Sequence, residues 1–524
     1  MSRTPPTVTC DGTGVVSHAG TVLLAELADR IGLTAALSEA TDGLRERRAG
    51  HDPGQVLIDV AVAIADGAVT ISDVQALADQ QGLHGPAGSI ASTPTIWRVL
   101  AGIANAPGML AKIRLARAEA RDRAWLARGE LTGAELPGSR AAGKLIGQVV
   151  IDLDATLVTA HSDKEGARGN FKGGFGYHPL GAWLDNTNEA LAALLRPGNA
   201  GSNTATDHLT VVEAALTQLP DRWRSKPILI RADGAGYSHA LISALSQQGL
   251  EFSVGYPVTQ AVRDAIRQVP KWAWTTASNA DGLLREHADV VDVTKMLDLS
   301  RWSSTCPDMR VIVRRELPHP GATLDAFEIR DGYRYQAFTT NTRSGQLAIL
   351  EARHRAHARV EDRIRTGKDT GLGHLPSRHQ NINEVWVELA LIAADLLALA
   401  QSMLLTTEPE LQRADPRRCG IGCCTSRPGS PADSAGCSCV WQSTGLGPWP
   451  SPKHSPACGR SRSRPDSQHH RDHATARDHH GDTGPSAGPQ RCPHNGILFL
   501  DHPRSESSPT ERPGLSPGIH RVDF

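Results

Sequence analysis

The sequence predicts an α/β fold in which a mixed β-sheet is flanked by helices, with a helical region before the sheet and a β-containing insertion within it. Three observations lead to this prediction. Residues from about 18 to 130 have the pattern of short helices separated by Gly and Pro. Strand-like runs begin at Lys144, and the elements then follow the order β-β-β-α-β-α-β. With 524 residues, 40% of them apolar, the chain is long enough for two or three domains with their own cores.

The N-terminal region, residues 1–140, is expected to be helical. Apolar residues between 23 and 31 keep helical spacing until Gly32 breaks the run, which is compatible with a helix-turn-helix. A second candidate helix begins at the Ser-Thr-Pro sequence 92–94 and carries Trp97. A helical bundle with Trp97 in its core fits the same residues, so both interpretations stay open.

A strongly basic helix is expected over residues 112–128, where six basic residues outnumber two acids. Such a face either contacts phosphates or is solvated, and the solvated face is favoured because charged helix faces usually lie in water. The six basic residues are Lys112, Arg114, Arg117, Arg121, Arg123 and Arg128.

The sheet is expected to begin with three adjacent antiparallel strands, in 145–158, 177–184 and 189–196. The last two flank the sequence Asp-Asn-Thr-Asn at 185–188, whose residues are typical of a hairpin turn. The following elements are a helix over 209–219, a strand over 227–232, a helix over 238–248 and a strand over 251–255. This order is that of a ribonuclease H-like core that lacks one closing helix.

The closing helix is expected only after an insertion. Residues 257–342 form this predicted insertion domain, with strand-like pieces at 309–316 and 333–340, and a long helix over 344–365 follows. A further apolar helix covers 382–405. The predicted division is therefore 1–140 for the helical region, 144–256 with 343–406 for the ribonuclease H-like core, 257–342 for the insertion and 408–524 for a tail.

The tail has a different composition from the rest of the chain. From about residue 408 the apolar periodicity gives way to Pro, Gly, Ser, Arg, His and Cys, so 408–524 is expected to be disordered. Seven of the nine cysteines lie there, but no repeated Cys-x₂-Cys pair frames a zinc site. The abrupt change at 416–419 suggests a shifted reading frame in a gene rich in G and C.

The charge balance excludes a globally basic protein. Lys and Arg total 55 and Asp and Glu total 56, so any surface for a polyanion must be local. No signal-peptide pattern and no run of about 18 apolar residues occurs. Only Cys10 and Cys306 precede residue 418, as expected in a reducing compartment. We therefore expect a cytoplasmic protein without a membrane partner.

Two candidate catalytic residues lie on one strand. In the sequence Val-Val-Ile-Asp-Leu-Asp-Ala-Thr (149–156), Asp152 and Asp154 occupy alternate positions and so point to the same face. Burying two unpaired charges there would be costly without a cation.

A third carboxylate, Asp233, stands where an apolar strand ends and a glycine-rich turn begins, a usual place for a group that faces a ligand. A turn or helix-cap aspartate is the alternative interpretation.

Glu361 is the fourth carboxylate, on the long predicted helix. His357, Arg365 and Lys368 lie at offsets of four and seven and share its face. A solvent-exposed, ion-paired glutamate would look the same. The stretch 341–378 holds eight basic and four acidic residues, an excess of 8 − 4 = +4, as expected where a polyanion is held.

Carboxylates of this kind suit phosphodiester cleavage. That reaction uses acidic oxygens to hold two Mg²⁺ ions about 3.5–4 Å apart, one beside the attacking and one beside the leaving oxygen. Mn²⁺ can take the place of Mg²⁺.

Several phrases of the sequence together resemble the DDE transposases of the insertion-sequence 1380 family, from the N-terminal helices to about residue 405. These phrases are Asp-Leu-Asp-Ala-Thr (152–156), Tyr-His-Pro-Leu (177–180), Leu-Arg-Pro-Gly-Asn (195–199), Arg-Ala-Asp-Gly-Ala-Gly-Tyr-Ser (231–238), Arg-Val-Glu-Asp-Arg-Ile (359–364) and Leu-Pro-Ser (375–377).

The resemblance implies a site and an activity. By position, the family's catalytic and metal-binding triad falls on Asp154, Asp233 and Glu361, with Asp152 as the alternative first aspartate. The helical region would recognise terminal inverted repeats, and the core would cut the DNA and join it to target DNA. A homodimer on DNA, associated with the bacterial nucleoid, is expected.

The family's Tyr-Arg-Glu-Lys signature is only partly present, because His354 or His357 stands where Tyr is usual and Arg355 or Arg359 would supply the arginine. Expected phosphate contacts are Lys172, Arg196, Arg359, Arg365 and Lys368. Trp272, Trp274 and Trp302 would stack on an unpaired base or pack in a core.

Two other functions remain open. The pattern Asp-x-Asp-x-Thr-Leu-Val is also the nucleophile motif of haloacid-dehalogenase-like phosphatases, with Asp152 attacking phosphate and Asp154 as general acid, although Asp233 has no second acid beside it. An inactive protein that binds transposon ends is the second alternative.

Overall fold

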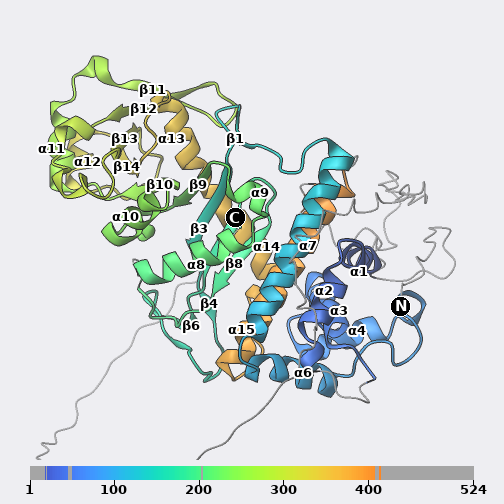
Figure 1. Cartoon of the computed structure of the whole chain (residues 1–524). Helices are drawn as coiled ribbons and strands as arrows, with labels where there is room; N and C mark the ends of the chain where they lie inside the picture. The colour runs from blue at the N-terminus through green and yellow to red at the C-terminus, as the bar shows by residue number, and fades with distance from the viewer. Residues whose placement is uncertain are drawn as a thin grey trace, which may run out of the picture. The chain divides into compact units, whose positions relative to one another are not determined.

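A computed structural model describes residues 18, 20–44, 50–201, 204–406, 412 and 414 of the chain. The predicted tail, 408–524, and the reading-frame change at 416–419 lie almost wholly outside these residues. The described part is a mixed α/β structure built on a large mixed sheet that helices flank (Figure 1). None of its helices is long and apolar enough to cross a membrane.

The elements alternate after an all-helical start. The helices are α1 Gly20–Arg30, α2 Leu33–Ala40, α3 Pro53–Ala65, α4 Gln75–Ala78, α5 Gln81–His84, α6 Thr93–Asn105, α7 Met109–Thr132, α8 Ala205–Thr217, α9 Asp221–Arg224, α10 His239–Gln247, α11 Gln260–Gln268, α12 Ala326–Asp331, α13 Leu347–Arg355, α14 Val360–Gly367 and α15 Gln380–Met403. The strands are β1 Ser139–Ala141, β2 Lys144–Ile146, β3 Val149–Ala155, β4 Val158–Thr159, β5 Arg168–Gly169, β6 Phe175–Tyr177, β7 Leu180–Leu184, β8 Ala190–Leu194, β9 Ile228–Ala232, β10 Glu251–Tyr256, β11 Thr275–Ser278, β12 Leu284–Asp292, β13 Arg310–Glu316 and β14 Arg334–Thr340.

The large sheet has nine strands in the order β11-β12-β13-β14-β10-β9-β3-β7-β8. Strand β3 lies antiparallel to β7 and parallel to β9, which in turn lies parallel to β10. The predicted hairpin is present as β7 and β8, with Asn188 in the left-handed region at φ 64°. Within the large sheet and its helices, β3, β7, β8, α8, β9, α10 and β10 follow the predicted order, but the short strands β4, β5 and β6 and the short helix α9, which were not predicted, come between them in the chain.

Residues 257–342 continue the same sheet. Their strands β11 to β14 are antiparallel, and β14 pairs with β10. Two small sheets lie apart from the large one. They are the hairpin β1-β2 and the three-stranded sheet β4-β6-β5.

Helices cover both faces of the strands around β3. Ile151 and Leu153 of β3 belong to the core that α8 and α10 share with the sheet. Asp152 and Asp154 alternate with them and so face the other way, toward α14, which contacts β3. The alternation of the strand therefore sends its acids and its apolar residues to opposite faces.

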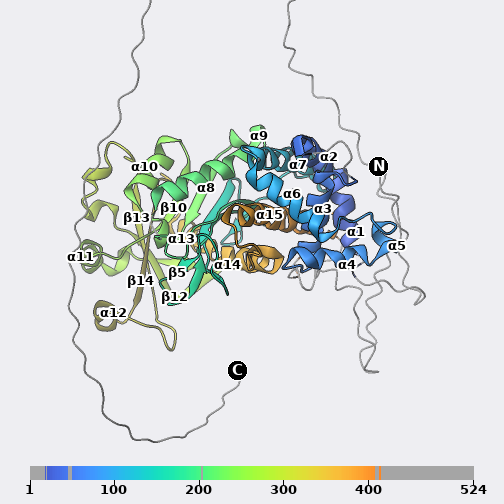
Figure 2. The ribbon, with the colours of Figure 1, turned by 90° about the horizontal axis from the view of Figure 1, so that it is seen from below.

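The N-terminal helices form a second core together with α15. Helix α15 is buried along nearly its whole length and contacts α3, α6 and α7 as well as β8 (Figure 2). Gly32, at φ 72°, separates α1 from α2 as the sequence predicted. Trp97 is 40% exposed, and Ile96 and Leu100 of α6 are buried in its place, so Trp97 is not the core residue of the bundle interpretation.

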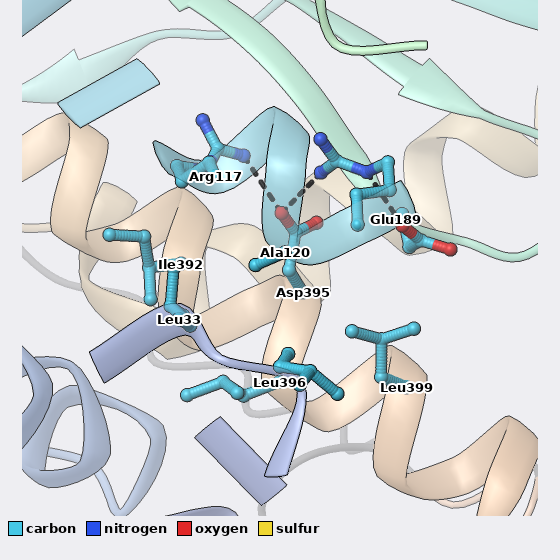
Figure 3. Close-up of a pocket in the computed structure, with 10 residues that line it drawn as sticks. Leu33, Arg117, Ala120, Glu189, Ile392, Asp395, Leu396 and Leu399 are labelled. Carbon is cyan, nitrogen blue, oxygen red and sulfur yellow. Dashed lines mark hydrogen bonds and ion pairs between the residues drawn. The ribbon is translucent and has the colours of Figure 1, made fainter. Parts of the chain in front are cut away.

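The basic helix α7 corrects a prediction. Its residues Arg117, Arg121 and Arg128 are buried rather than solvated. Asp395 of α15 accepts hydrogen bonds from Arg117 and Arg121, and Arg121 Nε donates to Glu189 Oε2 at 2.7 Å (Figure 3). Ion pairing with buried acids, not water, stabilises these charges.

The long predicted helix 344–365 is broken into pieces. Helix α13 ends at Arg355, a 3₁₀ segment covers Ala356–Arg359, and α14 follows. A π-helical turn, Lys368–Leu372, comes next and contains Gly371 at φ 90°.

Candidate functional site

The candidate site begins at the end of β3, where Asp154 is half-buried. Its Oδ1 accepts a hydrogen bond from the backbone N–H of Ala155 at 2.7 Å, and no basic side chain pairs with it among the described residues. The carboxylate therefore keeps acceptor capacity for a ligand.

Asp152, two residues earlier, is fully buried and occupied. Arg231 donates to both of its oxygens, at 2.7 and 2.8 Å, and Arg363 Nη1 donates to Oδ2 at 2.8 Å. Two buried aspartates were expected to need a cation. For Asp152 the positive charge comes from the guanidinium groups of Arg231 and Arg363. Asp152 cannot bind a metal ion without losing these contacts.

Asp185, from the β7-β8 turn, completes this buried network. Arg231, Arg359 and Arg363 all pair with it, and the positive charges hold the pKa of its carboxyl well below the usual range although burial alone would raise it. Ser139 also donates to its carboxylate. The network joins β3, β9, the β7-β8 turn and α14 beneath the exposed carboxylates.

Asp233 lies next to Asp154 across two parallel strands. Leu153 of β3 is paired with Ala232 of β9, so the residues that follow them, Asp154 and Asp233, lie side by side at the carboxyl ends of the strands. Asp233 is exposed and its Oδ1 caps the next turn by accepting from Ala235 N at 2.9 Å.

Glu361 comes from α14 and is exposed in its first turn. The pKa of Asp154 indicates that Glu361 lies within reach of its charge. Burial, as the largest cause, together with the negative charges of Asp233 and Glu361 raises the pKa of Asp154 to about 6, although His357 and the bond from Ala155 N–H lower it. The three carboxylates that the sequence singled out therefore lie near enough for the charges of Asp233 and Glu361 to act on Asp154.

His357, in the 3₁₀ segment just before α14, connects this part of the chain to β3. It is buried, and its Nε2 donates to the backbone oxygen of Leu153 at 3.1 Å, one residue before Asp154. Together with the Arg363–Asp152 ion pair, this bond fixes the approach of α14 to the end of β3, and hence the position of Glu361.

The donor set suits a hard divalent cation, because Asp154, Asp233 and Glu361 offer only carboxylate oxygens. In the described ranges, however, no three His, Cys, Asp or Glu side chains lie close enough together to hold a metal ion.

The five predicted phosphate contacts differ in exposure. Lys172 and Arg365 are exposed and Lys368 is half-buried. Arg196 is 3% exposed and bonds to the His178 oxygen and Asp207, so it faces the interior. Arg359 is half-buried and donates to Asp185 at 2.6 Å.

The three tryptophans that were expected to stack on a base also differ in exposure. Trp272 is 86% exposed, whereas Trp302 is 1% exposed in the core and stacks on His239. Trp274 lies under the guanidinium of Arg315, 4.2 Å from the ring centroid. Only Trp272 of the three presents an open ring.

Sequence reasoning missed the supporting residues Asp185, Arg231 and Arg363. Asp185 was interpreted as a turn residue, and Arg231 and Arg363 stand inside the quoted phrases without a role. One signal was available for Arg231: a charged residue inside an otherwise apolar strand needs a buried partner of opposite charge.

Comparison with known proteins adds three findings. The model of the family described as transposase DDE domain group 1 matches residues 2–418. A solved structure of the piggyBac transposase synaptic complex with hairpin DNA is similar over 80% of this chain and 82% of that chain, with a TM-score of 0.37 and 9% sequence identity. Among curated proteins, none matches the chain significantly.

Proposed function

The chain belongs to the family of group 1 transposase DDE domains, whose model spans most of it, and from this premise we propose that it binds the inverted repeats of a transposon and catalyses metal-dependent DNA strand cleavage and strand transfer. The observation that supports the proposal is that Asp154 and Asp233 follow paired residues at the ends of β3 and β9, and that the charges of Asp233 and Glu361 both act on Asp154. We propose these three as the catalytic and metal-binding residues.

We also propose that the sheet and its helices form a ribonuclease H-like core. Strands β8, β7, β3, β9 and β10 with helices α8 and α10 follow the order of a ribonuclease H-like core, which supports the division into a core of 144–256 and 343–406. Residues 1–140 would then read the transposon ends. Residues 257–342 would be an insertion that lengthens the core sheet.

Divalent metal ions are generally used by this family, and the carboxylates fit two Mg²⁺ ions in chemistry. Mn²⁺ could substitute. The ions supply positive charge to the attacking and leaving oxygens of the phosphodiester. The raised pKa of Asp154 supports the assignment, because a carboxyl that is buried among other carboxylates gains most from a bound cation.

The chain's own residues would position the DNA strand at the carboxylates. Asp233 and Glu361 are exposed, and the exposed Lys172 and the half-buried Lys368 can contact phosphate oxygens, as can Arg365 if it exchanges its ion pair with Asp362 for a phosphate. His357 and Arg363 act through Leu153 and Asp152 and keep α14 in place. We also propose target DNA and a second copy of the chain as partners.

The phosphatase alternative is disfavoured by Asp152. The nucleophile of that mechanism must reach a phosphate in solution, but Asp152 is fully buried and both its oxygens accept from arginines. No described acid pairs with Asp233 in the manner that this mechanism needs.

Strand cleavage of inverted-repeat DNA by the purified chain tests the proposal. We expect nicking at the transposon end with Mg²⁺ and none with EDTA. Asp154→Asn, Asp233→Asn and Glu361→Gln should each lower the rate by more than about a hundredfold, because each removes a charge that holds the metal. Asp362→Asn is the matched control, since Asp362 is an exposed acid next to Glu361 that pairs with Arg365.

Other outcomes would point elsewhere. Cutting that survives the loss of both Asp233 and Glu361 would reject the triad. A wild-type chain that binds the ends without cutting them would be an end-binding protein. Hydrolysis of p-nitrophenyl phosphate that depends on Asp152, without DNA cutting, would restore the phosphatase.

A further inference from the structure

The hairpin of β5 and β6 presents an aromatic ring to solvent. Phe171, in the loop between the two strands, is 74% exposed. The ring belongs to neither large core and contacts the ring of the buried His178 at 5.9 Å between centroids, so most of its surface is left open to a ligand. The question is which ligand would use it.

The hairpin loop is held in one conformation. Asn170 Oδ1 accepts from the N–H groups of Lys172 and Gly174, at 3.0 and 3.1 Å, and Asn170 N donates to the Gly174 oxygen at 2.7 Å. Gly173, at φ 79°, makes the turn that these bonds require. A ring on such a preorganised loop loses little conformational entropy when it binds a ligand.

Two positive charges accompany the ring. Lys172 Nζ lies 5.8 Å from the Phe171 ring centroid. The charge of Lys172 also adds to burial in lowering the pKa of Lys368, so the two ammonium groups are close enough to repel each other. In the described part of the chain neither lysine has an ion-pair partner, and an anion between them would relieve the repulsion.

The positive region continues away from the hairpin. Lys164, whose pKa burial lowers, donates to the backbone oxygen of Leu375, and its charge adds to the burial that lowers the pKa of His374. These groups border the segment that begins at Lys368. Lys164 thus adds one more cationic side chain beside the segment that contains Lys368 and Leu375.

The ring and the lysines belong to segments that adjoin the candidate catalytic residues along the chain. Lys368 follows Glu361 by seven residues, which corresponds to about 10 Å along a helix. Strand β6, on the other side of the ring, pairs with β4, which begins four residues after Asp154.

We propose that Phe171, Lys172 and Lys368 form a clamp for an unpaired DNA strand, in which the ring stacks on one base and the ammonium groups hold the adjacent phosphates. The inference rests on the proposed function, because it names the strand that the carboxylates would act on. A ring flanked by unpaired cations fits a ligand that is both aromatic and anionic. Bases in a duplex are already stacked on each other, so the exposed ring selects unpaired ones.

Binding of the full chain to a fluorescein-labelled twelve-nucleotide oligothymidylate, measured by anisotropy without divalent metal, tests the clamp. Phe171→Ala should weaken binding by between about 5-fold and about 100-fold, and Phe171→Trp should restore it. Lys172→Gln and Lys368→Gln should each reduce the slope of log K against log salt by about 0.7. The matched control is Leu284→Ala, which removes an equally exposed apolar side chain (71%) from β12 and should bind as the wild type does.

Photo-crosslinking gives a second, direct readout that does not depend on any variant. An oligonucleotide with one 5-iodouracil should crosslink to the peptide that contains Phe171. Crosslinking to Trp272 instead, or a Phe171→Ala variant that binds within twofold of the wild type, would overturn the clamp. A blunt-ended duplex of the same length is the comparison ligand. If the wild type and all variants bind it equally well, the surface would be assigned to contacts with the DNA backbone or with a protein.

The outcomes separate this inference from the proposed function. If the wild type cuts DNA with Mg²⁺ but Phe171 makes no difference to oligothymidylate binding, only the clamp is rejected. If binding depends on Phe171 but no metal-dependent cutting occurs, only the proposed activity is rejected.

Discussion

Asp152 and Asp154 differ in their surroundings although they share one face of β3. Asp152 lies directly opposite Arg231 of the neighbouring strand β9, and Arg363 reaches the same carboxylate from α14. Asp154 lies two residues further along β3, where β9 has ended and the turn at Asp233 begins. The strand register therefore decides which aspartate is neutralised by the protein and which is left for a cation from solution.

Removing each charge should have opposite effects on stability. We expect Asp152→Asn to lower the free energy of unfolding by about 3–5 kcal/mol, because Arg231 and Arg363 stay buried with an uncompensated charge. Asp154→Asn should leave it unchanged or raise it by about 1 kcal/mol, because ionised Asp154 is penalised by burial and by its acidic neighbours. Urea unfolding at pH 7.5 measures both, and equal losses for the two variants would contradict this assignment.

The sequence predicted the candidate triad but not its support. Asp154, Asp233 and Glu361 could be found because each stands in a short phrase with a recognisable local pattern. The partners of Asp152 could not, since Arg231 and Arg363 follow it by 79 and 211 residues and only the folded sheet and α14 bring them together. Arg196 and Arg359 looked like phosphate contacts because a sequence does not tell an arginine in an internal ion pair from an open one.

At the scale of the elements, α7 shows the same limit. A helix with six basic residues is usually solvated. The buried arginines of α7 instead form ion pairs with acids from the β7-β8 turn and from α15, namely Glu189, Glu388 and Asp395. Helix boundaries were predictable where a local signal exists, as at Gly32. The break between α13 and α14 was not, because it coincides with the bond from His357 to β3, which is a tertiary contact.

Helix α13 is seated on the sheet by His354, which gives its docking a pH dependence. The imidazole stacks on Phe338 with 4.4 Å between centroids, and its Nδ1 lies 3.0 Å from Ser253 Oγ. Burial first, and then the positive charges of His357, Arg231 and Arg314, lower its pKa to about 3.

The sign of the pH effect follows from this depressed pKa. Above about pH 6.5 the imidazole is neutral in both the folded and the unfolded chain, and below it only the unfolded chain binds the proton. Stability should therefore fall from about pH 6.5 toward about pH 3, with His354 contributing at most about 1.4 kcal/mol per pH unit. In His354→Gln this part of the slope should disappear in urea unfolding measured between pH 7 and pH 4.5. An unchanged slope would show that His354 is not the titrating group.

At the scale of the whole molecule, the sheet is larger than the predicted core. The order from β3 to β10 could be predicted from apolar runs and turn residues, whereas the pairing of β14 with β10 joins residues more than eighty positions apart and has no local signature. The predicted insertion therefore contributes strands to the core sheet, and a rigid continuation of that sheet follows from the ladder of hydrogen bonds.

The chain as a whole also carries a change of composition that its gene can explain. The apolar periodicity ends at 416–419, and the family match ends independently at residue 418. We propose that residues after about 418 are read in a shifted frame. Translation of the other two frames of the gene from this point should give, in one of them, a continuation with helical apolar spacing that extends the family match.

The upstream gene supplies the control. Codons for residues 300–400, translated in the shifted frames, should give the same excess of Pro, Gly, Ser, Arg, His and Cys as residues 419–524, because one base composition produces both. If neither downstream frame restores apolar spacing, the tail belongs to the protein as translated. If one frame restores it, the chain with the corrected frame should cut inverted-repeat DNA faster than the present chain, because the missing segment would add packing or DNA contacts while Asp154, Asp233 and Glu361 stay the same.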